Sequence, residues 1–166
     1  MKRHSINVTK QCAFRNEKGR CKRKTTKTHP YCGPHTEQVL GLRVAKSTIP
    51  LAGMGLFATR GFKKDEVICE YGGEKLTVDQ YDRRYGDDAM GSYGIQLDSK
   101  HVIDARKTSA GVARYACDYH GSGRRPNAEY VTDGGKIHIV AMRRIAAGEE
   151  ILTDYGDEMH RAMGIS

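Results

Sequence analysis

Three cysteines and one histidine lie close together near the N-terminus, and all four are of types that bind zinc. Cys12, Cys21, Cys32 and His35 follow the spacing C-x8-C-x10-C-x2-H. Structural zinc sites take four thiolate or imidazole ligands, and a histidine three residues after a cysteine gives a bidentate corner. The first 40 residues have little hydrophobic periodicity, so a metal cross-link would have to replace burial as the force that holds them together. The spacing therefore predicts a structural Zn²⁺ site.

Two alternatives to this interpretation stay open. The fourth ligand could be a different histidine of the segment, His29 or His4. The segment could also be an unstructured basic arm whose cysteines bind no metal. Gly33 and Pro34 favour the first ligand set, because they can form the turn between its last two members. The odd total of five cysteines argues against a framework of disulfides alone and favours a reducing compartment.

Tyrosines at the ends of strand-like segments form a second group of candidates. Tyr155 ends the run Ile145–Gly156, in which a glycine turn precedes two acids and an apolar pair. Tyr71 ends the β-like run Val67–Tyr71 in the same way, just before two glycines. A side chain at a strand end can be directed into a cleft while the sheet holds its backbone. Each tyrosine taken alone could also be an edge-strand residue with a satisfied hydroxyl.

The segments that must position these residues are typical of short strands with frequent turns. One short helix is expected from Val78 to Arg84, because Thr77 and Gln80 have the spacing of a capping box. A loop is expected to follow it at 86–92. The expected strands are Arg43–Ala45, Val67–Tyr71, the hairpin Tyr93–Leu97 with His101–Ala105, and the hairpin Ala128–Val131 with Lys136–Met142.

Positive charge is concentrated at the N-terminus. The chain has 28 Lys and Arg against 20 Asp and Glu, and residues 1–36 hold ten of the basic residues and one of the acids. The remaining 18 basic and 19 acidic residues leave 37–166 near neutrality. A polyanionic partner is therefore expected at the N-terminal segment, where Arg20–Lys24 is the densest cluster. The same cluster could instead be a nuclear-import patch or a solvated face. No segment has the length and apolarity of a membrane span or secretory signal, which favours an intracellular protein.

Six short motifs follow one another between about Arg43 and Asp157. They are G-M-G-L-F-A (53–58), E-Y-G-G-E (70–74), V-I-D-A (102–105), A-R-Y (113–115), P-N-A-E-Y (126–130) and G-E-E-I-L-T-D-Y-G (148–156). Each is weak alone, but in their joint order and spacing they resemble the motifs of the SET-domain protein lysine methyltransferases. The N-terminal spacing also resembles small three-cysteine, one-histidine zinc modules of some chromatin-associated proteins.

The resemblance implies a mainly β (α+β) fold of the SET type, a β-clip of small curled sheets whose C-terminal strand passes under a preceding loop in a knot-like core. S-adenosylmethionine would bind on one face, and the target lysine would enter by a narrow channel from the other. By position, Tyr155 matches the catalytic tyrosine, while Tyr71 and Tyr130 match residues lining the channel. The residues implied to contact the cofactor are Gly53, Met54, Gly55, Tyr93, Arg114, Tyr115, Cys117 and Asp118.

The chain departs from the family pattern after its A-R-Y motif. Cys117 replaces an amide that would hydrogen-bond the cofactor, and Asp118 stands where most members have histidine. A thiol is a poor donor and acceptor, and one lost bond to a charged group costs roughly 1.5–3 kcal/mol. The insertion Tyr119–Arg125 is longer than the tightest family form. No cysteine follows Tyr155, so Met159–Ile165 or the substrate would have to complete the channel wall.

We therefore expect a protein lysine N-methyltransferase that acts on histone tails in the nucleus. Tyr130 favours mono- or dimethylation by occupying space at the channel mouth, whereas the small Thr153 argues the other way. A non-histone substrate such as a ribosomal component fits the sequence equally well. The alternative is a chromatin or nucleic-acid binding module with a catalytically inactive SET domain. The expected organisation is a zinc module at 1–40, the SET domain at 41–159 and a tail at 160–166.

Overall fold

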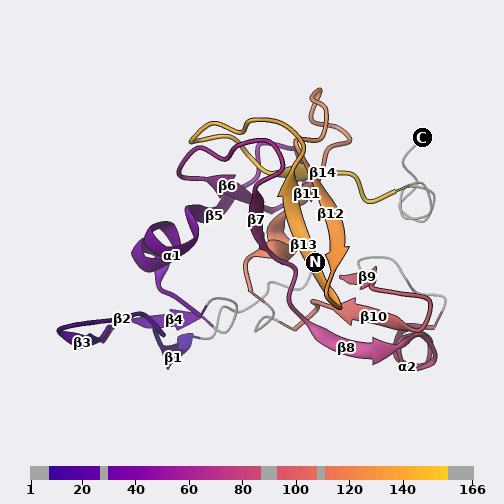
Figure 1. Cartoon of the computed structure of the whole chain (residues 1–166), viewed down its shortest axis with the longest axis horizontal. Coiled ribbons are helices and arrows are strands. Elements are labelled where there is room, and N and C mark those ends of the chain that lie inside the picture. The colour runs from indigo at the N-terminus through magenta and orange to yellow at the C-terminus, as the bar shows by residue number, and fades with distance from the viewer. Residues whose placement is uncertain (1–7, 27–29, 87–92, 108–110, 157–166) are drawn as a thin grey trace.

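The computed structural model describes residues 8–26, 30–86, 93–107 and 111–156 (Figure 1). Within these residues the chain forms several small sheets of short strands, with two short α-helices and one 3-10 turn. The expected mainly β (α+β) fold of small sheets is confirmed. The loop expected at 86–92 lies outside the described residues from position 87 onward, as do His4, His29, Met159–Ile165 and the tail.

The N-terminal part forms a small module that lies to one side of the other sheets (Figure 1). Strand β1 (Val8–Gln11) pairs antiparallel with β4 (Lys24–Thr26), and between them β2 (Arg15–Asn16) pairs with β3 (Gly19–Arg20). Helix α1 (Gly33–Leu40) follows and leads directly into the larger domain.

Helix α1 corrects one expectation. The sequence predicts only a turn at Gly33 and Pro34, but these residues open a helix, with proline in its first turn, where its missing N–H costs nothing. Gly41 ends the helix at φ 67°, and its N–H donates to the carbonyl of Glu37 at 2.9 Å. The helix is short and mostly polar, so it gives no apolar periodicity from which it could be predicted.

The larger domain begins with a hairpin that the C-terminal segment joins. Strand β5 (Leu42–Lys46) pairs antiparallel with β6 (Met54–Ala58). Two hydrogen bonds connect β6 to a segment nearly a hundred residues later: Ala58 N–H donates to the carbonyl of Glu149, and Ile151 N–H donates to the carbonyl of Leu56. These bonds hold β6 against residues 149–151.

A three-stranded sheet packs beside this hairpin. Strand β13 (Lys136–Ala141) lies between β12 (Ala128–Asp133) and β7 (Val67–Glu70), antiparallel to both. Ile137, Ile139 and Ala141 point inward at alternate positions, as expected for a sheet with one buried face. The hairpin expected across 133–135 is confirmed.

A second three-stranded sheet carries the other helix. Strand β10 (His101–Asp104) lies between β8 (Glu74–Thr77) and β9 (Gly94–Gln96), antiparallel to both. Helix α2 (Val78–Tyr85) follows β8 directly. Its capping box is present as expected, with Gln80 N–H donating to the Thr77 hydroxyl and Thr77 N–H donating to the Gln80 side chain.

The last described strand is much shorter than its sequence suggests. Of the run 145–156, only β14 (Leu152–Thr153) is a strand, and it pairs in parallel with β11 (Cys117–Asp118). Asn127 fastens this crossing: its side-chain amide donates to the carbonyl of Glu150 at 2.8 Å and its side-chain oxygen accepts from Leu152 N–H at 2.8 Å. Buried side chains from β5, β6, β10, β13 and the connecting segments form the main core; they include Leu42, Leu56, Phe62, Ile103, Ile137, Ile139, Ile145 and Ile151.

Candidate active site

Tyr155 joins the end of β14 to the segment that contains β11. Its N–H donates to Asp118 Oδ2 at 2.8 Å, and its hydroxyl donates to the carbonyl of Ala116 at 2.8 Å. The residue is 37% exposed, although its hydroxyl is bonded to the backbone of Ala116. The parallel pairing of β11 and β14 therefore holds Tyr155 against residues 116–118, as the resemblance implies.

Tyr71 and Tyr130 lie against each other from neighbouring elements. Tyr71 directly follows β7 and is 5% exposed. Its ring meets that of Tyr130 edge to face, with 5.6 Å between centroids and an interplanar angle of 84°. The Tyr71 hydroxyl donates to the carbonyl of Tyr93 at 2.8 Å. The Tyr130 hydroxyl accepts from Thr153 Oγ1 at 3.2 Å. The hydroxyls of Tyr71, Tyr130 and Thr153 thus come from three separate segments of the chain.

The three phenols share a dry environment. Burial raises the pKa of Tyr71 and of Tyr155 far above the ordinary phenol range, and their neighbouring phenols raise it further. Burial also raises the pKa of Tyr130, although its bond with Thr153 opposes the shift. Thr153 connects the packed pair Tyr71–Tyr130 to the segment of Tyr155, because its Oγ1 lies 3.2 Å from the Tyr130 hydroxyl and 3.4 Å from the carbonyl of Cys117. At neutral pH the three tyrosines of this phenol cluster are uncharged hydroxyls that orient a polar group and do not accept protons.

Cys117 and Asp118 lie between this cluster and β6. The Cys117 thiol donates to the carbonyl of Met54 at 3.5 Å, and burial raises its pKa, so it stays a neutral thiol. Asp118 Oδ1 accepts from the N–H of His120 at 2.9 Å and contacts its Nδ1 at 2.6 Å. With its other oxygen on Tyr155 N–H, Asp118 ties the segment 118–120 to the segment that carries Tyr155. Its visible role is to position the tyrosine.

The two positions of the G-M-G motif require glycine for different structural reasons. Gly53 has φ +78° and open space where a side chain would be, and Met54 beside it is 47% exposed. A Cβ on Gly55 would instead collide with the carboxylate of Glu150. Gly53 therefore leaves backbone accessible, as close approach by a ligand requires, while Gly55 makes room for a protein side chain.

Glu150 lies within the motif at 148–156, but the resemblance gave it no role; its carboxylate lies against Gly55. It is 1% exposed and accepts hydrogen bonds from the Ser47 hydroxyl at 2.5 Å, the Thr48 N–H at 3.1 Å, the Thr48 hydroxyl, and Arg124 Nη2 at 3.3 Å. Burial alone would raise the pKa of Glu150, but these bonds outweigh it and the pKa is lowered. An acid inside the apolar run Ile145–Leu152 is the sequence signal that could have revealed it.

Arg114 lies beside the phenol cluster and has buried N–H donors without hydrogen-bond partners among the described residues. Its guanidinium carbon is 4.3 Å from the centroid of the Tyr93 ring and 5.4 Å from that of Tyr115. Its Nε and Nη1 are buried and have no hydrogen-bond partner among the described residues. Buried guanidinium donors are rarely left unpaired. The arrangement therefore fits a ligand that carries an anionic group on this side of the cluster.

The four predicted metal ligands converge in the N-terminal module. The ligand atoms of Cys12, Cys21, Cys32 and His35 all lie within 4.8 Å of one another. His35 Nδ1 is 3.4 Å from Cys12 Sγ and 3.2 Å from Cys32 Sγ. A tetrahedral site with zinc-to-ligand distances of about 2.0–2.3 Å has edges close to these values. The Cys3His cluster is thus present with the predicted members.

Local structure prepares this cluster for a cation. Phe14 stacks on the His35 ring with 3.9 Å between centroids and fixes its orientation. Burial would raise the pKa of the Cys12 thiol, but hydrogen bonds from the backbone of Cys32 and Phe14 and from His35 lower it to about 6. Burial raises the pKa of Cys32, and the neighbouring Cys12 adds to the shift. Cys12 is therefore the thiol best prepared to be a thiolate.

Arg20 has a structural role that its position in the basic cluster does not suggest. Its Nε donates to the carbonyl of Cys12 and its Nη2 to the carbonyl of Gln11, each at 2.9 Å. The Arg20 guanidinium thereby holds the backbone at Gln11 and Cys12, next to the predicted metal site. Lys22, Arg23 and Lys24 are exposed and are the members of the cluster that face solvent.

Sequence comparison identifies relatives of the chain. A sequence profile of the SET domain matches residues 53–156. The human protein named histone-lysine N-methyltransferase 2D is 33% identical over 145 residues, which cover 82% of this chain. The Drosophila melanogaster histone-lysine N-methyltransferase trithorax is 32% identical over 62% of the chain. A Saccharomyces cerevisiae histone-lysine N-methyltransferase, H3 lysine-4 specific, is 36% identical over 64% of it.

The chain spans only a small part of these relatives, 2% of the human protein, 3% of the fly protein and 10% of the yeast protein. The similarity therefore concerns one domain of each. Separately, among the described residues, the structure contains no helix with the length and apolarity needed to cross a membrane.

Proposed function

The chain belongs to the SET-domain family, and we propose that it is an S-adenosylmethionine-dependent protein lysine N-methyltransferase. The observation that carries this proposal is that Tyr71 and Tyr130 pack ring to ring while Thr153, two residues before Tyr155, contacts the Tyr130 hydroxyl, so that three distant segments bring their tyrosines to one region. We assign Tyr155 the catalytic position and the other two tyrosines to the walls of the lysine channel.

The chemistry asked of this cluster is modest. Methyl transfer to an amine needs a neutral lysine, and neutralising a side chain of pKa about 10.4 at pH 7 costs roughly 4.6 kcal/mol. A dry channel lowers that cost, because desolvation opposes the ammonium form. Neutral phenols can then orient the amine, and alignment of two reacting groups can supply on the order of 7–11 kcal/mol of barrier reduction.

The residues near β6 and β11 fit the proposed cofactor, which would supply an electrophilic methyl group and a positive charge. Arg114 has two buried donors that suit its carboxylate, and the open backbone at Gly53 allows close approach. Met54, Gly55, Tyr93 and Tyr115 complete the proposed binding surface. Cys117 and Asp118 border it, but each already bonds to protein groups, which favours a supporting role for both.

We further propose a histone tail as the substrate and the nucleus as the compartment, because the named relatives are histone-lysine methyltransferases. A non-histone protein stays the second candidate substrate. Mono- or dimethylation is expected: the Tyr130 hydroxyl is held by Thr153, so Thr153 does not enlarge the channel independently of it.

The N-terminal module is proposed to bind structural Zn²⁺ through Cys12, Cys21, Cys32 and His35 and to contact nucleic acid or the nucleosome through its basic surface. The proposed organisation is the zinc module at 1–40 and the SET domain at 41–159.

A labelled-methyl transfer assay tests the proposal. Histones, nucleosomes and a whole lysate are incubated with labelled cofactor and either the full chain or a chain without residues 1–40, and mass spectrometry counts the methyl groups per lysine. Transfer to a lysine is expected. If no methyl group is transferred to histones, to nucleosomes or to lysate proteins, the result counts against an enzyme. Abundant trimethyl-lysine would overturn the expectation of mono- or dimethylation.

The alternative function is a chromatin or nucleic-acid binding module without catalysis. Cys117 favours it, because a thiol that is 8% exposed and directed at the carbonyl of Met54 leaves one fewer donor for a cofactor. Calorimetric titration with S-adenosylmethionine separates the two: measurable heat supports the enzyme, and no heat at millimolar cofactor supports the binding module.

A further inference from the structure

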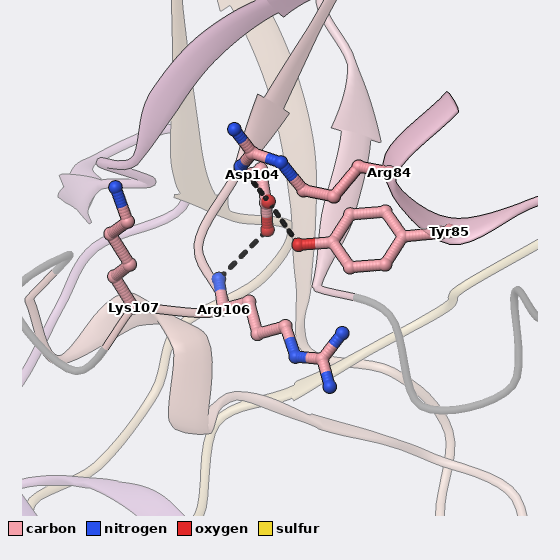
Figure 2. Close-up of a pocket in the computed structure, with 5 residues that line it drawn as sticks. All are labelled: Arg84, Tyr85, Asp104, Arg106 and Lys107. Atoms are coloured by element: carbon pink, nitrogen blue, oxygen red, sulfur yellow. Dashed lines mark hydrogen bonds and ion pairs between the residues drawn. The ribbon is translucent and has the colours of Figure 1, made fainter. Parts of the chain in front are cut away.

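A pocket of about 400 Å³ opens beside helix α2, outside the phenol cluster. Figure 2 shows its lining, with Arg84 and Tyr85 from the end of α2 on one side and Lys107 on the other. Asp104, the last residue of β10, lies between them, and Arg106 extends beneath the Tyr85 ring.

Asp104 holds this pocket together. It is 2% exposed, and its carboxylate accepts from Arg84 Nη1 at 3.1 Å, from the Tyr85 hydroxyl, and from the N–H of Arg106 at 2.9 Å. A buried carboxylate with this many donors is satisfied within the wall. It therefore fixes the cationic side chains in place and leaves little negative charge facing the cavity.

The remaining charges favour an anion. Arg84 binds both oxygens of Glu74, at 3.0 and 3.1 Å, and Lys107 binds the same carboxylate at 3.0 Å. These two partners lower the pKa of Glu74 to about 2. Three cations thus face two carboxylates. The guanidinium of Arg106 lies 5.1 Å from the centroid of the Tyr85 ring and has no carboxylate partner among the described residues.

The pocket is connected to the proposed lysine channel by one backbone group. The carbonyl of Tyr93 accepts the Tyr71 hydroxyl at 2.8 Å and the N–H of Ala105 at 3.1 Å. Ala105 stands between Asp104 and Arg106 in the chain. The same carbonyl thus joins the backbone beside Tyr71 to the strand end that carries the pocket residues.

We propose that this pocket binds an anionic side chain of the protein substrate, a carboxylate or a phosphate, close to the acceptor lysine. This inference rests on the proposed methyltransferase function and adds a substrate preference to it. A guanidinium fork and an ammonium group are suited to carboxylate or phosphate oxygens. The same charges repel a lysine or arginine at that position of the substrate.

A phosphate of nucleic acid would offer the same oxygens, but the structure favours a side chain. Duplex backbones are contacted by extended basic surfaces, and the exposed cations Lys22, Arg23 and Lys24 of the N-terminal module form a surface of that kind. The pocket instead gathers three cationic side chains, Arg84, Arg106 and Lys107, around one small cavity.

The first test needs no catalysis. The ¹⁵N-labelled full chain is titrated with sodium phosphate, with sodium chloride at equal ionic strength as the reference. Saturable shifts of the Arg106 and Arg84 side-chain N–H signals are expected, and Arg106→Gln should weaken phosphate binding about tenfold. Arg83→Gln is the matched control, because Arg83 is also on α2 but donates to the carbonyl of Asp79 and does not line the pocket.

Shifts that do not saturate, or that are equal in the wild type and Arg106→Gln, would overturn the anion site. Lys107→Gln provides a second variant, so that a folding defect in one does not decide the result; a well-dispersed amide spectrum verifies each fold.

The second test assigns the site to the substrate. A peptide that the enzyme methylates is varied near its lysine with glutamate, phosphoserine or neutral glutamine and serine. At one spacing, kcat/KM for the anionic forms should exceed that of the neutral forms about tenfold, and Arg106→Gln should bring the ratio close to one. Glutamate and phosphoserine separate the two anion sources. Phosphate binding without any peptide preference would overturn the assignment to the substrate, whereas failure to methylate any peptide would concern the proposed function itself.

Discussion

At the scale of single residues, the candidate site depends on hydroxyls that are buried but already bonded. Tyr155 donates to Ala116, Tyr71 to Tyr93, and Tyr130 accepts from Thr153. Each bond fixes the direction of a phenol before any substrate arrives. Preorganised dipoles of this kind need not reorganise during a reaction, and this is why the loss of one is costly to turnover.

Tyr155→Phe tests this role directly. The variant keeps the ring and loses only the hydroxyl, so we expect kcat to fall on the order of a hundredfold while stability falls by about 1 kcal/mol. Methyl transfer kinetics and thermal unfolding measure the two effects. Tyr81→Phe, the same change on helix α2, should leave kcat unchanged. Near-normal methylation by the Tyr155 variant would remove this residue from the catalytic position.

Glu150→Gln tests the buried carboxylate behind the G-M-G motif. The amide cannot accept all the bonds from Ser47, Thr48 and Arg124, so the free energy of unfolding at pH 7 should fall by about 1–3 kcal/mol. The folded-state pKa of Glu150 lies below 4.5, so its contribution is present above that pH and is lost as the pH falls through the folded value.

Urea unfolding between pH 3 and 7 measures both effects. The wild type should lose stability below about pH 4.5 more steeply than Glu150→Gln does. Glu129→Gln, at an exposed position on β12, is the control and should keep the wild-type profile. Parallel profiles for the wild type and Glu150→Gln would refute the lowered pKa.

At the scale of elements, local patterns predicted most of the strands and failed where distant contacts decide. The hairpins β9–β10 and β12–β13 follow from alternation and turn residues, and α2 follows from its capping box. Helix α1 has no apolar periodicity. The run ending at Tyr155 is mostly not a strand, because Asn127 and β11 determine its pairing from far away in the chain.

The candidate site shows the same division. The motifs indicated which tyrosines to examine. They contain Asn127 but gave no sign of its bond to the carbonyl of Glu150, or of the bonds that Arg124 makes to Thr48 and Glu150, because those bonds depend on tertiary packing. The spacing of the cysteines and the histidine, by contrast, was sufficient to predict the four members of the Cys3His cluster, because the ligand residue types are visible in the sequence itself.

Removal of metal tests the N-terminal module. Structural zinc contributes roughly 10–16 kcal/mol to the folding of small modules, so chelation should expose the amides of β1–β4 to hydrogen exchange while those of β12 and β13 stay protected. Elemental analysis of protein purified without chelator should give about one zinc per chain. Less than half an equivalent, or unchanged exchange after chelation, would contradict the ligand assignment.

At the scale of the whole molecule, the positive charge is concentrated in the N-terminal segment and not in the part of the chain that holds the phenol cluster. Residues 1–36 carry ten basic side chains and one acid, while the remainder is close to neutral. The module that carries this charge also lies to one side of the sheets in Figure 1. Attraction to a polyanion can therefore act through one end of the chain without covering the phenol cluster.

Salt dependence of DNA binding measures this separation. Replacing Lys22, Arg23 and Lys24 with glutamine should reduce the slope of log affinity against log salt by about three units, close to 0.9 for each phosphate that the variant no longer neutralises. The control replaces Lys64, Lys75 and Lys100, which are exposed on the larger domain, and removes the same charge. Equal slopes for both variants would show that binding follows net charge and not the module.

The parallel pairing of β11 with β14 also has a consequence for biosynthesis. The partners of residues 117–118 are translated 35 positions later, and residues 117–118 pair with no other strand in the described part of the chain. Until the ribosome has passed Gly156, the nascent polypeptide has neither Tyr155 in place nor its crossing closed. The pairing that holds Tyr155 therefore forms only after residues 152–155 have been translated, and shorter nascent chains expose apolar edges that chaperones recognise.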